Sequence, residues 1–349
     1  MVQKEKPILR IEELKTYFFT EHGVVRAVDG VDLTVFPNEI VGLVGESGCG
    51  KSVTSLSIMG LLASTGRIVG GKIFFGEDNL LDLNKKQLQN IRGNKISMIF
   101  QQPQSSLNPV LPVGSQIAEI LRIHESMSSK SAWSRAEKLM ELVGLPSVKQ
   151  KSHSFPHELS GGQAQRVMIA MALALKPKLL IADEPTTALD VTIQAQILDL
   201  IREKNQLLGT AVILITHDLG IVAEMANYVA VMYAGRIVEK ANVNDLFNDP
   251  LHPYTQGLLK SLPVLGEKKT RLDVIPGNVP NLMNLNPGCK FADRCSLRSK
   301  YKINLCRERD PILSDVVPGH KVACWLYDND INQSLSRLQT KDHVERFEI

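Results

Sequence analysis

The feature that most constrains the fold is a glycine-rich segment, GESGCGKS, that begins at residue 45. The apolar run EIVGLV before it is typical of a short buried strand, and the residues after it place apolar side chains at helical spacing. The pattern G-x-x-x-x-G-K-S between a strand and a helix is the motif of a phosphate-binding loop. Glycines let backbone N–H groups approach a phosphate closely, and the start of a helix favours an anion. The sequence therefore predicts a nucleotide site in which Lys51 approaches the terminal phosphates and the Ser52 hydroxyl ligates Mg²⁺.

A second motif ends in two acidic residues. The apolar run 179–182 is typical of a buried strand, and Asp183 and Glu184 follow it at once. A carboxylate at the end of a strand lies at the edge of a parallel sheet where ligands bind. An acidic pair alone would usually mark a solvated turn, but the strand before it and the phosphate loop upstream favour a site. We therefore predict that Asp183 holds Mg²⁺ and that Glu184 polarises an attacking water.

A third segment, LSGGQ, stands at residues 159–163, directly before a strongly helical run. Two glycines and a serine at the start of a helix form a second cradle for an anion. One chain does not need two such cradles for one nucleotide, so we expect the second to serve ATP held by a partner chain. The residues predicted to make this contact in trans are Ser160, Gly161, Gly162 and Gln163.

Together these segments resemble the ATP-binding subunits of ABC transporters, and further segments follow in the order of that family. IFQQP is similar to the family's Q-loop, TALD to its D-loop and LITHD to its switch strand. The resemblance implies that Glu184, His217 and Gln101 are catalytic, with His217 at the γ-phosphate, and that Asp190 contacts ATP in trans. The implied Mg²⁺ ligands are Ser52, Gln101 and Asp183. The residues implied to bind ATP within the chain are Phe18, Gly45, Ser47, Gly48, Cys49, Gly50, Lys51, Ser52 and Val53.

The adenine contact is the least determined part of this site. The family stacks an aromatic residue near the N-terminus on adenine, and LKTYFFTEHG offers Tyr17, Phe18 and Phe19. Alternation along the predicted strand does not decide among them. We favour Phe18; in the alternative, all three aromatic residues only fill the core.

The hydrophobic patterns and the resemblance together predict the fold class. We expect an α/β, ABC-type P-loop ATPase with a mainly parallel core sheet, an antiparallel β subdomain, an inserted helical subdomain and a C-terminal cysteine-rich extension. The expected boundaries are an ATPase domain at 6–255 with its helical subdomain at about 103–165, an extension at 256–330 and a polar tail at 331–349.

A narrower resemblance covers nearly the whole chain. DPLHPYTQGLL, IPGNVPNL and GCKFADRC are similar to the C-terminal extension of the ATPases of dipeptide and oligopeptide ABC importers. It implies that the chain hydrolyses ATP to power peptide import. The implied partners are two membrane permeases, a second, related ATPase subunit that completes an ATP-sandwich dimer and, indirectly, an external peptide-binding protein. The ATPases of nickel importers, which share much of this cassette, are the alternative.

Composition bears on partners and on location. The 349 residues carry a net charge of +3, which is too mild to argue for nucleic acid, so a soluble ABC ATPase that clamps nucleic acid is the weaker rival. The N-terminus shows no apolar run of signal-peptide length, and the longest apolar stretch, 167–175, is far too short for a membrane span. We therefore expect a peripheral protein at the cytoplasmic face of the cell membrane.

Four of the five cysteines fall in one loop-rich segment. Cys289, Cys295, Cys306 and Cys324 leave gaps of 5, 10 and 17 residues. Cytosolic thiols are kept reduced, which favours metal ligation over disulfides. Zinc prefers cysteines two to four residues apart, and four thiolates also suit an iron–sulfur cluster. The family resemblance points to a [4Fe–4S] cluster; zinc, or cysteines that are unligated or disulfide-linked, are the alternatives.

Overall fold

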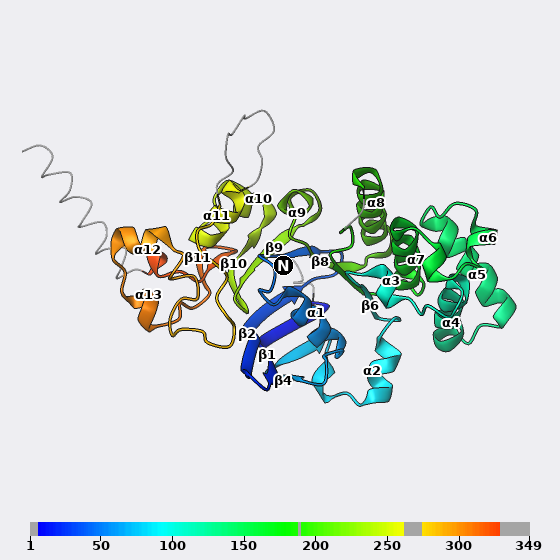
Figure 1. Ribbon diagram of the computed structural model, residues 1–349, viewed down its shortest axis with the longest axis horizontal. Coiled ribbons are helices and arrows are strands. Elements are labelled where there is room, and N and C mark those ends of the chain that lie inside the picture. The colour runs from blue at the N-terminus through cyan, green and yellow to red at the C-terminus, as the bar shows by residue number, and fades with distance from the viewer. Residues whose placement is uncertain (1–5, 188–189, 262–273, 329–349) are drawn as a thin grey trace, which may run out of the picture.

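The computed structural model describes residues 6–187, 190–261 and 274–328. A central sheet lies between a helical subdomain and the C-terminal segment, by which we mean the described residues from 251 to 328, and a smaller sheet lies beneath it (Figure 1). The expected polar tail at 331–349 lies outside the described residues. No helix within the described ranges is both long and apolar enough to cross a bilayer.

The smaller sheet is the antiparallel β subdomain that alternation predicted. Its strands run in the order β2-β1-β4-β5. Their bounds are β1 Leu9–Thr20, β2 Gly23–Val35, β4 Gly66–Phe75 and β5 Asp78–Asn79. One face of this sheet packs on the central sheet, because apolar residues of β1 and β2 share a core with those of β3, β7 and β8. Burial on one face is what the alternating pattern requires.

The central sheet has eight strands in the order β11-β12-β10-β9-β3-β8-β7-β6. Their bounds are β3 Ile40–Val44, β6 Ile96–Ile99, β7 Leu179–Asp183, β8 Ala211–Ile215, β9 Tyr228–Tyr233, β10 Arg236–Asn242, β11 Ser314–Val317 and β12 His320–Val322. The five strands from β9 to β6 are parallel, and β10, β12 and β11 join antiparallel. The sheet is therefore mixed, and the prediction of a mainly parallel sheet holds for the five strands from β9 to the edge strand β6.

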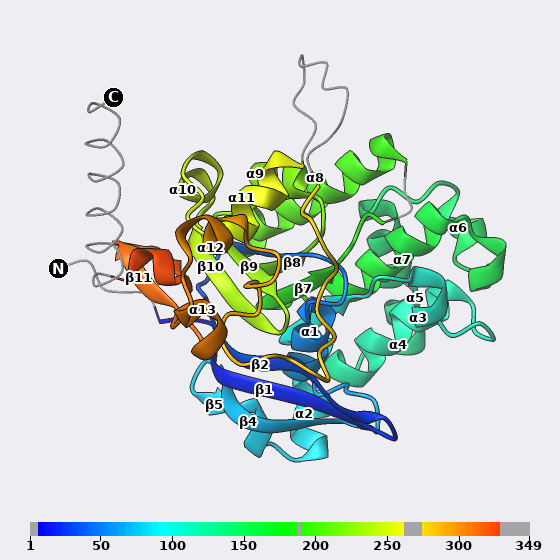
Figure 2. The ribbon, with the colours of Figure 1, turned by 60° about the vertical axis from the view of Figure 1, so that its left-hand side comes forward.

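The helices surround this sheet. Their bounds are α1 Lys51–Met59, α2 Lys85–Ile91, α3 Pro103–Ser106, α4 Val113–Glu125, α5 Ser129–Leu142, α6 Val148–Lys151, α7 Gly161–Leu173, α8 Val191–Leu208, α9 Leu219–Met225, α10 Val243–Asn248, α11 Pro253–Lys260, α12 Ser296–Tyr301 and α13 Leu305–Glu308. Short 3₁₀ turns lie at Leu80–Asp82, Pro156–Glu158 and Trp325–Tyr327. Figure 2 shows α12 and α13 beside β10 and β11, at the end of the sheet opposite the helical subdomain.

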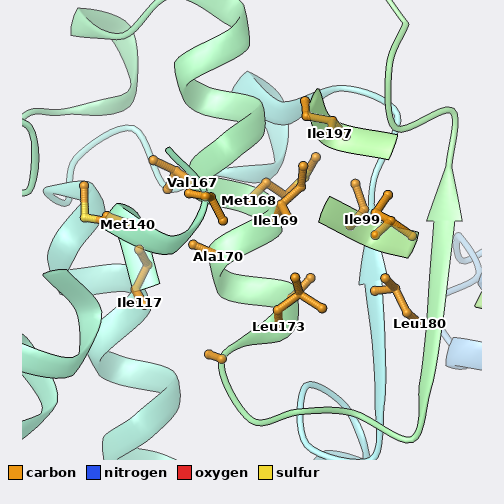
Figure 3. Packing of buried hydrophobic residues seen from close by; sticks show 14 of the residues in the cluster. Ile99, Ile117, Met140, Val167, Met168, Ile169, Ala170, Leu173, Leu180 and Ile197 are labelled. Carbon is orange, nitrogen blue, oxygen red and sulfur yellow. The ribbon is translucent and has the colours of Figure 1, made fainter. Parts of the chain in front are cut away.

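Helix α7 ties the helical subdomain to the sheet. Ile117 of α4 and Met140 of α5 approach one side of it, while Ile99 of β6, Leu180 of β7 and Ile197 of α8 belong to the same buried cluster on the other (Figure 3). A helix that is apolar nearly all round is buried between two layers. Each fully buried Leu or Ile contributes about 1.5–3 kcal/mol, so the residues that precede α7 are held on a firmly packed base.

Candidate functional site

The phosphate-binding loop joins β3 to α1, and its backbone needs glycine at two positions. Gly45 has φ +151°, and a Cβ there would lie 2.1 Å from the carbonyl oxygen of Met232. Gly50 has φ +111°, and its Cβ would lie 2.3 Å from the carbonyl oxygen of Ala27. Any other residue would clash with backbone at both places. The loop is therefore pressed against β2 and β9, which leaves its opposite side open to a ligand.

Lys51 is folded back into this loop. Its Nζ donates to the carbonyl oxygens of Gly45, at 2.8 Å, and Glu46, at 3.0 Å. The ammonium group is thus placed beside the loop in which phosphates are expected to lie. Cys49 is fully buried in the same loop, and burial raises the pKa of its thiol. A neutral, enclosed thiol behaves as a small apolar residue.

Two of the three predicted protein ligands of Mg²⁺, Ser52 and Asp183, meet at the start of α1. The Ser52 Oγ donates to Oδ1 of Asp183 at 3.1 Å. Burial raises the pKa of Asp183, with the neighbouring Glu184 adding to the effect, although the hydrogen bond from Ser52 opposes it. A largely buried carboxylate beside a hydroxyl fits a hard divalent cation, which takes oxygen ligands. The residues present therefore suit Mg²⁺.

Gln101, Glu184 and His217 converge because they follow three adjacent parallel strands, β6, β7 and β8. The Glu184 carboxylate accepts from Nε2 of Gln101 at 2.8 Å and lies 3.1 Å from Nδ1 of His217. Thr187 Oγ1 also donates to it at 2.8 Å. Burial alone would raise the pKa of Glu184, but these hydrogen bonds outweigh it and the pKa is lowered. The site thus holds an ionised, firmly oriented carboxylate next to the Ser52–Asp183 pair.

The segment predicted to act in trans lies at the start of α7, which begins at Gly161. Ser160 caps α7: its Oγ accepts from the Gln163 N–H, and the Gln163 Oε1 accepts from the Ser160 N–H, both at 3.3 Å. Ser160 and Gly161 are exposed. Asp190 is also exposed and caps α8 by accepting from the N–H of Ile193 at 2.9 Å. These groups thus use their hydrogen bonds within their own helix starts and leave their outer surfaces open.

The three candidate aromatic residues have different surroundings. Tyr17 donates its hydroxyl proton to Asp29 at 2.7 Å. Phe18 is half-buried and packs on Gly66, and Phe19 is 45% exposed beneath the guanidinium of Arg67. The choice of Phe18 as the adenine contact stays a prediction.

Sequence reasoning missed residues that the fold brings to the site from a distance. Thr187 could have been found, since it lies three positions after Glu184. Arg294, which pairs with Glu46, and Tyr254, whose hydroxyl accepts from the Glu46 N–H at 2.8 Å, carry no local signal. They come from the C-terminal segment.

All four cysteines of that segment line one small cavity, which His252 and Arg298 also border. Burial raises the pKa of Cys289 and Cys324 to about 12 and that of Cys306 to about 11. All the thiols are free. In the part of the chain that is described, no group of three or more His, Cys, Asp or Glu side chains is arranged to hold a metal ion. The predicted cluster, and zinc as its alternative, therefore have no support from a formed metal site.

One further feature of this cavity bears on whether a cluster fits. The Nε of Arg298 is buried there without a hydrogen-bond partner. Four thiols that line one cavity and an unpaired cationic donor would suit an anionic thiolate-bound group better than an apolar void. The types of residue that line the cavity are therefore those that such a group requires.

This arrangement of a phosphate loop, the Ser52–Asp183 pair and a carboxylate at the end of a strand defines a nucleotide-binding cassette of the ABC class. Residues 28–187 match the family model described as "ABC transporter". Two solved cassettes share the fold: the dimeric, post-hydrolysis MJ0796 bound to ADP and Pi (27% identity, TM-score 0.62, 67% of this chain and 98% of that one), and cbiO1 from Clostridium perfringens (28%, TM-score 0.58, 70% and 92%).

The C-terminal segment narrows the assignment. Residues 238–301 match the model "Oligopeptide/dipeptide transporter, C-terminal region". The probable peptide ABC transporter ATP-binding protein y4tR of Sinorhizobium fredii is 51% identical over 93% of this chain and 96% of its own length. The oligopeptide transport ATP-binding protein AppD of Bacillus subtilis is 50% identical over 93% and 98%. The chain belongs to the ATP-binding proteins of peptide ABC transporters, as the sequence resemblance predicted.

Proposed function

We propose that the chain is the ATP-hydrolysing subunit that powers import of di- or oligopeptides through a membrane ABC transporter. The observation that carries the chemistry is the cluster of Gln101, Glu184 and His217 beside the Ser52–Asp183 pair. The observation that favours peptides over nickel is the match of residues 238–301 to the oligopeptide/dipeptide transporter model. The weaker rival, a nucleic-acid ATPase, is favoured by neither observation.

Each side chain takes one role in hydrolysis. Lys51 leaves the loop carbonyls that it now contacts and binds the β- and γ-phosphates. Ser52, Asp183 and Gln101 would hold Mg²⁺, which would supply positive charge opposite the phosphate oxygens. Glu184 accepts a proton from water as the water oxygen attacks the γ-phosphorus, and the bond to the ADP oxygen breaks. His217 steadies the γ-phosphate.

The remaining ATP contacts belong to the same proposal. Backbone groups of the loop bind phosphate oxygens, and Phe18 stacks on adenine. The loop residues concerned are Gly45, Ser47, Gly48, Cys49, Gly50 and Val53. Ser160, Gly161, Gly162, Gln163 and Asp190 act on ATP held by a second, related ATPase subunit. The exposure of Ser160, Gly161 and Asp190 supports a head-to-tail sandwich of two subunits.

The proposed assembly has further parts. Two permease subunits receive the ATPase pair at the cytoplasmic face of the membrane, and an external binding protein delivers peptide to them. The boundaries proposed are 6–255 for the ATPase domain, about 103–165 for its helical subdomain and 256–330 for the extension. Proteoliposomes with all subunits would take up labelled peptide with ATP; uptake of Ni²⁺ instead would favour the alternative.

Replacement of Glu184 by Gln tests the hydrolytic role. The amide keeps the shape but not the basicity, so MgATP binding should persist while kcat falls by about 10²–10⁴-fold. Glu77→Gln is a matched control, since Glu77 is 86% exposed and pairs with an equally exposed Lys6. Wild-type turnover by the Glu184 variant would refute the role.

We also propose that Cys289, Cys295, Cys306 and Cys324 hold a [4Fe–4S] cluster with a structural role. Support comes from the shared cavity and the unpaired Arg298 Nε. Anaerobically purified protein should be brown, with broad absorbance near about 400 nm, and Cys→Ser at any of the four positions should bleach it. Colourless protein with one zinc per chain would reject the cluster; metal-free protein would reject both.

A further inference from the structure

The C-terminal segment directly contacts the phosphate-binding loop. Arg294 forms a two-pronged ion pair with Glu46, the second residue of the loop: Nη1 lies 2.7 Å from Oε2 and Nη2 lies 3.0 Å from Oε1. The Arg294 side chain is only 6% exposed, and that of Glu46 is 27% exposed. Paired, planar hydrogen bonds of this kind are among the stronger and more directional contacts between side chains.

The guanidinium of Arg294 is fixed by its own surroundings. Its Nε donates to the carbonyl of Pro276 at 2.9 Å, and Nη2 also approaches the carbonyl of Ile275 at 3.4 Å. The rings of Tyr233 and Phe291 lie 5.8 and 5.9 Å from its central carbon. The two backbone carbonyls and the two aromatic rings all orient this one guanidinium group. Its paired N–H donors are therefore preorganised toward Glu46.

Glu46 lies between this arginine and the lysine of the loop. Its backbone N–H donates to the hydroxyl of Tyr254 at 2.8 Å, and its carbonyl accepts from Nζ of Lys51 at 3.0 Å. Movement of Glu46 would therefore move the carbonyl that now holds Lys51. The contact with Arg294 consequently bears on both the charge and the shape of the loop.

A carboxylate within a loop that receives a triphosphate opposes the binding of its ligand, since like charges repel at close range. We propose that Arg294 is a positioning residue for ATP: it neutralises Glu46 and holds the phosphate loop in its binding form from the C-terminal segment. The proposal rests on ATP binding at this loop and is independent of the transported substrate. Arg294 itself stays outside the ligand site. Its N–H groups are directed at Glu46, at the hydroxyl of Tyr233 and at the carbonyl oxygens of residues 275 and 276.

This mechanism predicts an effect that grows with phosphate number. Arg294→Gln leaves the Glu46 charge uncompensated, so the Kd for MgATP should rise about tenfold, equivalent to about 1.4 kcal/mol. The rise should be smaller for ADP and smallest for AMP, because fewer phosphate charges face the carboxylate. A purely structural role would weaken all three nucleotides alike.

Four variants of the full chain separate charge from structure. Arg294→Lys keeps the charge without the fork and should lie between wild type and Arg294→Gln. Glu46→Gln removes the repelling charge, and should bind MgATP at least as tightly as wild type. The double variant, with glutamine at both positions, should recover most of the loss. Arg307→Gln is the matched control, since Arg307 is 64% exposed and pairs with an equally exposed Asp293 at 3.5 Å.

Equilibrium titration with ATP, ADP and AMP measures the Kd of each variant for each nucleotide. Thermal unfolding of the same variants shows whether each one is folded. Restoration of affinity in the double variant supports the proposal. Equal Kd values for Arg294→Gln and Arg307→Gln overturn it, and so does a double variant as weak as Arg294→Gln. If Arg294→Gln fails to fold, Glu46→Gln still decides, because tenfold weaker MgATP binding by that variant contradicts electrostatic relief. Failure of wild type to bind MgATP would instead refute the proposed function.

Discussion

A buried carboxylate on β10 fastens the C-terminal segment to the central sheet. Glu239 is 0% exposed and accepts three hydrogen bonds: from the N–H of Leu251 at 2.6 Å, from the N–H of His252 at 2.9 Å and from Nε2 of His320 at 2.7 Å. The first two donors precede α11, and the third lies on β12. Glu239→Gln should therefore loosen two segments that are distant in the sequence.

The size of the effect follows from the acceptor geometry. Oε1 accepts from Leu251 and His320, and Oε2 accepts from His252. In the better of its two orientations, a glutamine amide keeps the first pair but turns its NH₂ group toward the His252 N–H. That loses one bond to a charged acceptor, about 1.5–3 kcal/mol, and leaves buried donors unsatisfied at about 1–3 kcal/mol. We expect the free energy of unfolding to fall by about 3–5 kcal/mol.

Urea unfolding of the full chain measures the loss, and hydrogen exchange locates it. Amides at the start of α11 and in β12 should exchange faster in Glu239→Gln, while those of α4 and α5 should not change. Glu77→Gln, at an 86% exposed position, should show no measurable shift. An unfolding free energy within about 0.5 kcal/mol of wild type would refute the reasoning.

Two further predictions concern the loop and a buried histidine. Gly45→Ala should weaken MgATP binding by at least about tenfold, because its Cβ would lie 2.1 Å from the Met232 carbonyl oxygen and strained backbone adds about 1–3 kcal/mol. Gly70→Ala is the control: its Cβ would make only an ordinary contact with the Lys15 side chain at 3.6 Å, so it should bind normally in the same titration. Burial lowers the pKa of His252 to about 3. Below the pKa of about 6.5 that a histidine has in the unfolded chain, only the unfolded chain gains the proton, so the free energy of unfolding decreases as the pH is lowered. Between pH 7 and 5.5, wild type should lose about 1 kcal/mol more than His252→Asn by urea unfolding; equal losses would contradict this.

The residues proposed to act in hydrolysis could be named from the sequence because each has a local signal. Gln101, Glu184 and His217 all follow short apolar runs that are typical of buried strands. Their mutual contacts depend on the order β6-β7-β8, which no local pattern contains. The family resemblance supplied that order indirectly, since it implied one site for all three.

The contacts between the cassette and its C-terminal segment could not be predicted from local sequence patterns. Glu46 and Arg294 are 248 residues apart, and both are charged residues of a kind that usually marks solvated surface. Glu239 lies in a strand that looks ordinary in sequence, yet its carboxylate is fully buried. Strands β11 and β12 lie in a polar, turn-rich stretch, and their pairing with β10 follows from docking of the whole segment. Such contacts depend on tertiary placement, which outweighs local propensity.

Two of the contacts that hold the C-terminal segment on the cassette should have different consequences when they are lost. Strand β12 pairs with β10 at only two register positions, Glu239 with Val322 and Lys240 with Lys321. So short a pairing is weak by itself, and the buried Glu239 network supplies the strength. Arg294 makes the second of these contacts, with Glu46 of the phosphate loop. Loss of the first should lower stability with little change in ATP affinity, whereas loss of the second should lower both stability and ATP affinity. If both substitutions changed stability and affinity in proportion, the segment would act as one rigid support.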